Sequence, residues 1–348
     1  MCNKVENKMD QQRPQLTDES RKKAGISQMK VFYQNQYLFW RVAVVKSIRK
    51  ILKTSDSFYE DLEDELCFDQ SQLSPEERTD IVHNQIKNGW LFEAVAQAEQ
   101  SIEDLFSLLK NAKDPAFFAK DVITYKVGTI SSFIREFETY DLQTVLDAFD
   151  LPYFPLDEPW ENAEVFERYR KSVLMIQAYV KDLATFHQKY YLDYCQYKHG
   201  MAVSLCPFGN NKKGEFQEEK KAHWGDGALM TFDNYEISKR MNKTNNLPQL
   251  CLYVTESTQP YLSQLHDENN LLHFSMHAVD IDEVVKITEE AFTLLNVLWA
   301  NLLNKNEYTE ADVFREVAFP VEDYRRYYTI VFPMKKDDDA MENNHNIK

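Results

Sequence analysis

Apolar side chains recur at helical spacing over the first two-thirds of the chain. Residues 28–53 and 74–109 both follow the 3.6-residue period of an α-helix. The second segment opens with Ser74 and Pro75, and Glu77 completes a capping box. One carboxylate interrupts its apolar stripe, which comprises Phe92, Val95, Ala96, Glu99, Ile102, Leu105, Phe106 and Leu109. The pattern predicts two long helices.

Three more helices are expected further along the chain. Asp-Pro at the start of 114–140 is a helix-opening signal, and the proline-bearing stretch 151–159 is a clear break. Residues 160–205 contain no proline and predict one very long helix or a broken pair. Residues 280–303 form a strongly amphipathic pattern, which predicts a helix with one buried face.

Short segments rich in β-formers appear only in the last third of the chain. They are residues 229–232, 250–254, 272–279 and 328–332. Together with the helices they predict a mainly α (α+β) fold, a long-helix bundle with a small antiparallel β extension.

The polarity of the chain divides it into five parts. We expect a disordered N-terminal segment at 1–26, a helical bundle at 27–205 and a polar loop at 206–227. Residues 228–333 are expected to form the small sheet and a helix that completes the bundle, and 334–348 a disordered tail.

Composition excludes several classes of function. A net charge of −16 disfavours nucleic acid and anionic membranes as partners, so RNA could bind only through a local basic patch. Eight glycines are few for phosphate-binding loops. The five cysteines show no C-x-x-C spacing, which indicates a reducing compartment. No apolar run is long enough to span a membrane, so we expect a cytoplasmic protein.

The most distinctive segment is a tyrosine-rich stretch that ends in Lys198-His199-Gly200. At helical spacing His187, Tyr191, Tyr194 and Lys198 share one face. An imidazole beside an ammonium could act as a general base, and a lysine could stabilise an anionic transition state. Lys-His-Gly is equally the signature of a helix C-terminus, where a cation and a glycine are favoured.

This segment resembles the Lys-His-Gly helix of bacterial HEPN-like helical-bundle proteins. The resemblance covers about residues 75–205 and includes the aromatic and acidic stretch from Trp90 to Glu103. It implies a helical bundle that dimerises about a shared cleft and acts in conflict or phage-defence systems. Members that are metal-independent ribonucleases carry an arginine followed after four to six residues by a histidine. The resemblance would make His199 the acid/base, with Lys198 as anion stabiliser.

The chain departs from that catalytic pattern. The positions upstream of His199 that would hold the arginine are Leu192, Asp193 and Tyr194, and Asp193 cannot stabilise an oxyanion. Arg78 and His83 do satisfy the Arg-x4-His spacing. They lie at the start of the 74–109 helix, where a solvated helix start is the alternative to a functional pair, and a five-residue offset places them on different faces.

No cofactor or metal site is expected. His273 and His277 have the spacing that chelates a metal on a helix, but the pattern there predicts a strand. Two hypotheses remain. The first is a non-catalytic interaction or sensor protein, a homodimer or partner-bound, with His187, Tyr191 and Tyr194 as its interface, since tyrosine suits interfaces. The alternative is a metal-independent endoribonuclease that uses His199, with Lys198 or Arg78 as the cation.

Overall fold

A computed structural model describes most of the bundle and the paired strands. The described residues are 17–36, 39–66, 75–124, 126–137, 141–151, 163–200, 203–204, 227–233, 249–252, 273–307, 314–320 and 327–333.

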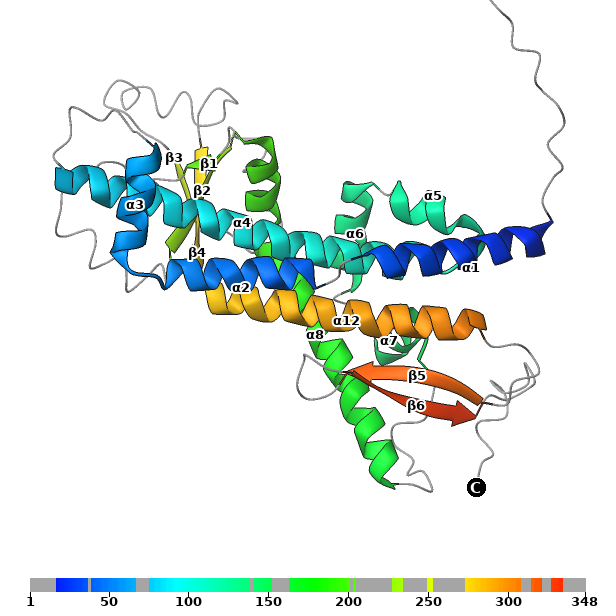
Figure 1. Ribbon diagram of the computed structural model, residues 1–348. Helices are drawn as coiled ribbons and strands as arrows, with labels where there is room; N and C mark the ends of the chain where they lie inside the picture. Colours follow the sequence, from blue (N-terminus) through cyan, green and yellow to red (C-terminus); the bar gives the residue numbers. More distant parts are fainter. Residues whose placement is uncertain are drawn as a thin grey trace, which may run out of the picture.

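The fold is mainly helical, as the sequence predicts (Figure 1). The helices are α1 (Asp18–Asn35), α2 (Trp40–Leu52), α3 (Asp56–Leu66), α4 (Pro75–Asn111), the 3₁₀ turn η1 (Pro115–Phe117), α5 (Phe118–Ile123), α6 (Val127–Phe137), α7 (Leu142–Ala148), α8 (Ala163–His199) and α12 (Ile281–Glu307). None of those in the described ranges combines the length and apolar character that a bilayer span requires.

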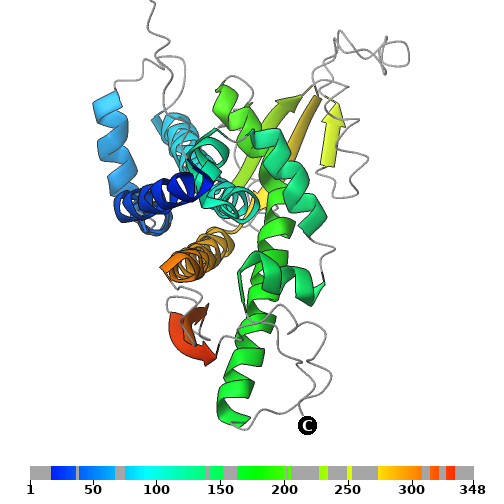
Figure 2. The same ribbon diagram turned by 90° about the vertical axis from the view of Figure 1, so that its right-hand side faces the viewer.

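The core lies where α4, α8 and α12 meet. Helix α12 packs along α4 and α2, and α8 contacts both α4 and α12. Figure 2 looks along α4 and α12, with α8 running across them. The predicted apolar stripe of α4 is buried over its whole length, and so is the predicted face of α12. Hydrophobic burial of these faces holds the three longest helices together.

Two small antiparallel sheets complete the fold. Strands β1 (Val203–Ser204), β2 (Gly227–Asp233), β4 (His273–Val279) and β3 (Gln249–Leu252) pair in that order. Strands β5 (Phe314–Pro320) and β6 (Tyr327–Pro333) form a hairpin against α12 and α8. The β extension was therefore predicted correctly, although the short β1 and the buried β5 were not. The register of β2 and β4 sets Leu229 opposite His277.

The N-terminal prediction needs correction. Residues 18–26, expected to be disordered, belong to α1, which begins after the N-cap Thr17 and has two acidic side chains in its first turn. The single helix expected over 28–53 is two helices, since α1 ends at Asn35 and α2 begins at Trp40. The helix expected over 114–140 is divided into η1, α5 and α6, and α1 packs directly on η1 and α5. Residues 1–16 and 334–348, predicted to be disordered, and the 206–226 part of the predicted loop lie outside the described residues.

A pair of helical glycines tests the contact between α1 and η1. A Cβ on Gly25 would collide with the backbone carbonyl of Pro115, whereas a Cβ on Gly128 in α6 would meet nothing within 4 Å. We expect Gly25→Ala to lower the free energy of unfolding by about 1–3 kcal/mol through overpacking. Gly128→Ala is the control and should leave it unchanged or raise it by up to about 1 kcal/mol. Urea denaturation measures both, and equal effects of the two substitutions would contradict the close approach.

Candidate functional site

Helix α8 is joined to α4 and α6 by a buried histidine. The Nδ1 atom of His187 lies 2.7 Å from Oε2 of Glu99, and its Nε2 atom lies 3.0 Å from the Ser131 hydroxyl. All three side chains are buried. Burial raises the pKa of the Glu99 carboxyl, and the adjacent imidazole opposes that shift. The two contacts of His187 therefore bind α8 to α4 and α6 within the core.

These three residues follow the carboxylate–imidazole–hydroxyl order of a serine hydrolase. A nucleophile needs an open site beside it for the reacting carbonyl and the oxyanion donors. Ser131 is only 6% exposed and lies inside α6. It does not line the groove or cavities formed by residues of α1, α2, α4, α5, α6 and α12 described below. We therefore interpret the three residues as a structural contact that holds α8 against α4 and α6.

A second buried pair binds α8 to the sheet. Nδ1 of His277 lies 2.6 Å from Oδ2 of Asp193, and the Thr231 hydroxyl donates to the other carboxylate oxygen at 3.3 Å. Burial raises the pKa of Asp193, which is opposed by His277. Asp193, noted in the sequence as a departure from the ribonuclease pattern, thus holds the β4 and β2 strands against the helix. His277 lies in a strand, as predicted, so it cannot chelate in the helical i, i+4 manner.

The end of α8 carries a third polar contact. The Tyr194 hydroxyl donates to Oε2 of Glu103 at 2.9 Å, and the Lys198 ammonium lies 3.7 Å from the same oxygen. That ammonium also lies 3.9 Å from the centre of the Tyr194 ring. Oε1 of Glu103 and Oε1 of Glu99 are buried and have no hydrogen-bond partner among the described residues. Lys198 is therefore engaged by the carboxylate and the ring, while part of its side chain remains exposed.

The expected tyrosine interface is wrong for two of its three residues. His187 and Tyr194 are buried inside the chain, because their face of α8 packs against α4. Tyr191 is partly buried, and its ring centre lies 4.5 Å from that of His187. The buried aromatic side chains belong to the core of the bundle. Their helical spacing alone does not distinguish a buried core face from a protein interface.

The Lys-His-Gly motif ends the helix. Gly200 has a φ of +73°, and its amide donates to the carbonyls of Gln196 and Tyr197. This is the left-handed C-terminal cap for which glycine is preferred. The side chains of His199 and Arg78 lie outside the described residues. His83 is buried, with its ring 5.2 Å from that of Tyr59, so the expectation of a solvated helix start is wrong at that position.

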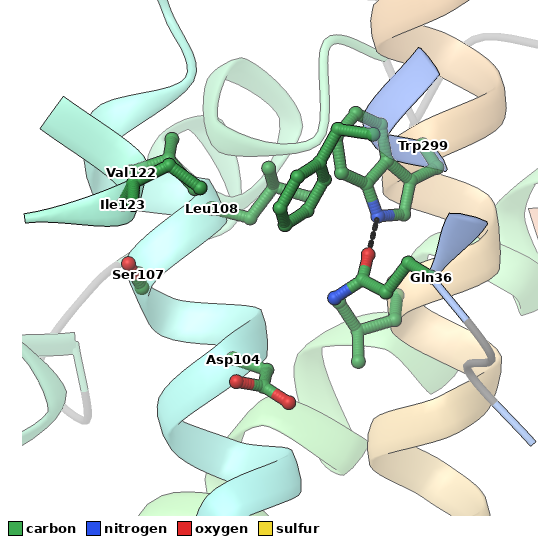
Figure 3. Close-up of a pocket in the computed structure, with 9 residues that line it drawn as sticks. Gln36, Asp104, Ser107, Leu108, Val122, Ile123 and Trp299 are labelled. Carbon is green, nitrogen blue, oxygen red and sulfur yellow. Dashed lines mark hydrogen bonds between the residues drawn. The ribbon is translucent and has the colours of Figure 1, made fainter. Parts of the chain in front are cut away.

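A groove opens between the α1–α2 junction and the helices α4 and α12. Its wider part encloses about 730 Å³ and is lined by Asn35, Gln36, Phe39, Trp40, Arg41, Ser101, Asp104, Phe292 and Leu295. A smaller cavity of about 200 Å³ shares Gln36, Asp104 and Leu295 with it and extends toward Trp299 (Figure 3). Phe39 and Trp40 are each 60% exposed. The sequence did not single out this site, because its residues come from four separate helices and from the break between two of them.

The polar wall of the groove is organised by Arg41. Its Nε and Nη2 atoms donate to Oδ2 of Asp104 at 3.1 and 3.0 Å, and Nη1 donates to the side-chain carbonyls of Gln97 and Gln100. Burial raises the pKa of Asp104, and the guanidinium opposes that effect.

Among the described residues no group of three histidine, cysteine or acidic side chains is arranged to hold a metal.

Comparisons with protein-family models, curated proteins and solved structures found no match to this chain.

A buried carboxylate on α12 predicts how stability depends on pH. Burial raises the pKa of Glu290 from 4.5 to about 7, although Lys286 lies 3.4 Å away. Because the folded state holds this proton more tightly, its stabilising contribution is complete below pH 4.5 and is lost as the pH rises to about 7. At pH 8 we expect Glu290→Gln to be more stable than the wild type, by up to about 3 kcal/mol. Urea denaturation at pH 5 and pH 8 measures this.

The same variant at pH 5 serves as the control. There the wild-type carboxyl is already protonated in the folded state, so the gain from the amide should vanish. An advantage of Glu290→Gln that is equal at both pH values would show that the burial of a charge is not its cause.

Proposed function

We propose that the protein is a non-catalytic interaction or sensor protein built on a HEPN-like helical bundle. The observation that supports the proposal is the contrast between helix α8 and the groove beside α1 and α2. His187 and Asp193 of α8 are buried and paired within the chain, whereas two large aromatic side chains stand exposed at the groove. Exposed aromatic surface beside a concave site is typical of binding sites.

The remaining parts of the proposal rest on the sequence. The acidic charge favours a protein or a neutral ligand over RNA. A cytoplasmic location agrees with the cysteine usage, and a homodimer or a complex with a partner protein agrees with the HEPN-like resemblance. Action in a conflict or phage-defence system comes from that resemblance alone.

The alternative is a metal-independent endoribonuclease that uses His199. It is favoured by the partly exposed Lys198 ammonium at the same helix end, which supplies a cation beside that histidine in sequence. The absence of an arginine at Leu192, Asp193 or Tyr194 and the engagement of Lys198 by Glu103 count against it.

Expression and RNA cleavage decide between the two. We expect the purified wild type to leave total RNA intact, and its expression to be no more toxic than that of His199→Ala. The physical reason is that the cation next to His199 is held by Glu103 and Tyr194. Gel analysis of the RNA and growth curves measure both effects.

Lys305→Ala, which removes an exposed lysine on α12 that pairs with Asp150, is the matched control for surface charge. RNA cleavage that disappears in His199→Ala, with unchanged thermal unfolding, would overturn the proposal in favour of the nuclease.

A further inference from the structure

The groove and its smaller cavity form one site with aromatic walls. Phe32 and Trp299 line the inner part, and Phe39 and Trp40 line the outer part. Flat rings of this kind stack on planar ligands. Because the inner cavity of about 200 Å³ is below the usual range for drug-sized ligands, its occupant must be small.

The orientation of the Gln36 amide is fixed by a buried indole. Nε1 of Trp299 lies 3.1 Å from Oε1 of Gln36, and an indole N–H can only donate. The carbonyl must therefore face the tryptophan, which leaves the amide NH₂ for the cavity. Figure 3 shows this nitrogen turned away from Trp299, toward the side on which Asp104 and Ser107 lie. The Gln36 amide therefore offers a donor.

Asp104 offers an acceptor to the same space. Its Oδ2 atom accepts two hydrogen bonds from Arg41. The side chain is 29% exposed and lines both the groove and the smaller cavity. Its Oδ1 atom makes no hydrogen bond to the described residues and remains to accept one from a ligand. Gln36 thus offers a donor and Asp104 an acceptor to one small cavity with an aromatic wall.

The charges around the site exclude a strongly anionic ligand. Arg41 is the one cation that lines these two cavities among the described residues, and it is paired with Asp104, with four of its five N–H groups donated to Asp104, Gln97 and Gln100. A phosphate would therefore meet no free cation, and the chain as a whole carries a charge of −16. An uncharged ligand fits this environment.

We propose that this site binds a small, uncharged, planar heterocycle that carries a lactam edge, as in the nucleobases uracil and hypoxanthine. The ring N–H donates to Oδ1 of Asp104, the adjacent ring carbonyl accepts from the Gln36 amide, and the ring packs against the aromatic wall formed by Phe32 and Trp299, whose ring centres lie 5.9 Å apart. The inference rests on the proposed binding function and names its ligand class.

Calorimetry on the full chain tests the proposal with uracil, hypoxanthine, N,N′-dimethyluracil and uridine monophosphate. We expect saturable binding of at least one of the two free bases. The dimethylated base lacks the N–H donor and should bind at least about tenfold more weakly, which corresponds to the loss of one hydrogen bond. The monophosphate should also bind more weakly, because no free cation meets its phosphate.

Two variants assign the binding to these side chains. Gln36→Met removes the donor and leaves the Arg41–Asp104 pair intact, and Asp104→Asn removes the charged acceptor. Each should weaken binding at least about tenfold. Asp121→Asn, the same change in a separate cavity beside α5, is the control and should bind as the wild type does. Circular dichroism melts confirm that each variant is folded.

Three results would overturn the proposal. They are the absence of saturable binding for both free bases, binding of the dimethylated base as tight as that of the free bases, and undiminished binding of the free bases by folded Gln36→Met. RNA cleavage by the wild type would contradict the proposed function and leave these binding results as they are, so the two failures are distinguishable.

Discussion

The buried contact between Glu99 and His187 is the constraint on which the arrangement of the bundle depends. A carboxylate with no exposed surface is costly in a hydrophobic core unless an opposite partner and hydrogen bonds compensate it. Here the partner comes from a different helix, and the imidazole reaches a hydroxyl on a third. The position of α8 relative to α4 and α6 is therefore set by polar geometry as well as by apolar packing. The pair of Asp193 and His277 does the same for α8 and the sheet.

This constraint separates the two regions that could carry function. His187 and Asp193 of α8 are occupied in holding elements together, while the groove beside α1 and α2 keeps a donor and an acceptor unoccupied. The two regions are nevertheless linked by hydrogen bonds, since Arg41 contacts Gln97, Gln97 donates to Glu93, and Tyr197 donates to the same carboxylate. A ligand that touches Asp104 would thus meet one end of a bonded chain that reaches the last turn of α8.

The sequence predicted the architecture well where one periodic pattern determined it. The buried faces of α4 and α12 followed from apolar spacing, whereas the buried contact of Glu99 with His187 was not predicted, because a carboxylate on a helix is usually solvated. The tyrosine stripe of α8 was misjudged, because the same spacing serves core and interface. The break between α1 and α2 also escaped prediction, since the apolar period continues across it in the sequence. The groove could not be predicted, because Gln36, Asp104 and Trp299 are far apart in the chain and only tertiary packing brings them together.

The buried carboxylate–imidazole contact fixes α8 as a structural element. A double-mutant cycle on Glu99→Gln and His187→Gln, followed by urea denaturation, measures the strength of this contact. We expect each single substitution to lower the free energy of unfolding by about 3–5 kcal/mol. The double variant should lose less than the sum, with a coupling of about 0.5–3 kcal/mol. Single losses below about 1 kcal/mol, as for an exposed ion pair, with additive effects in the double variant, would contradict it.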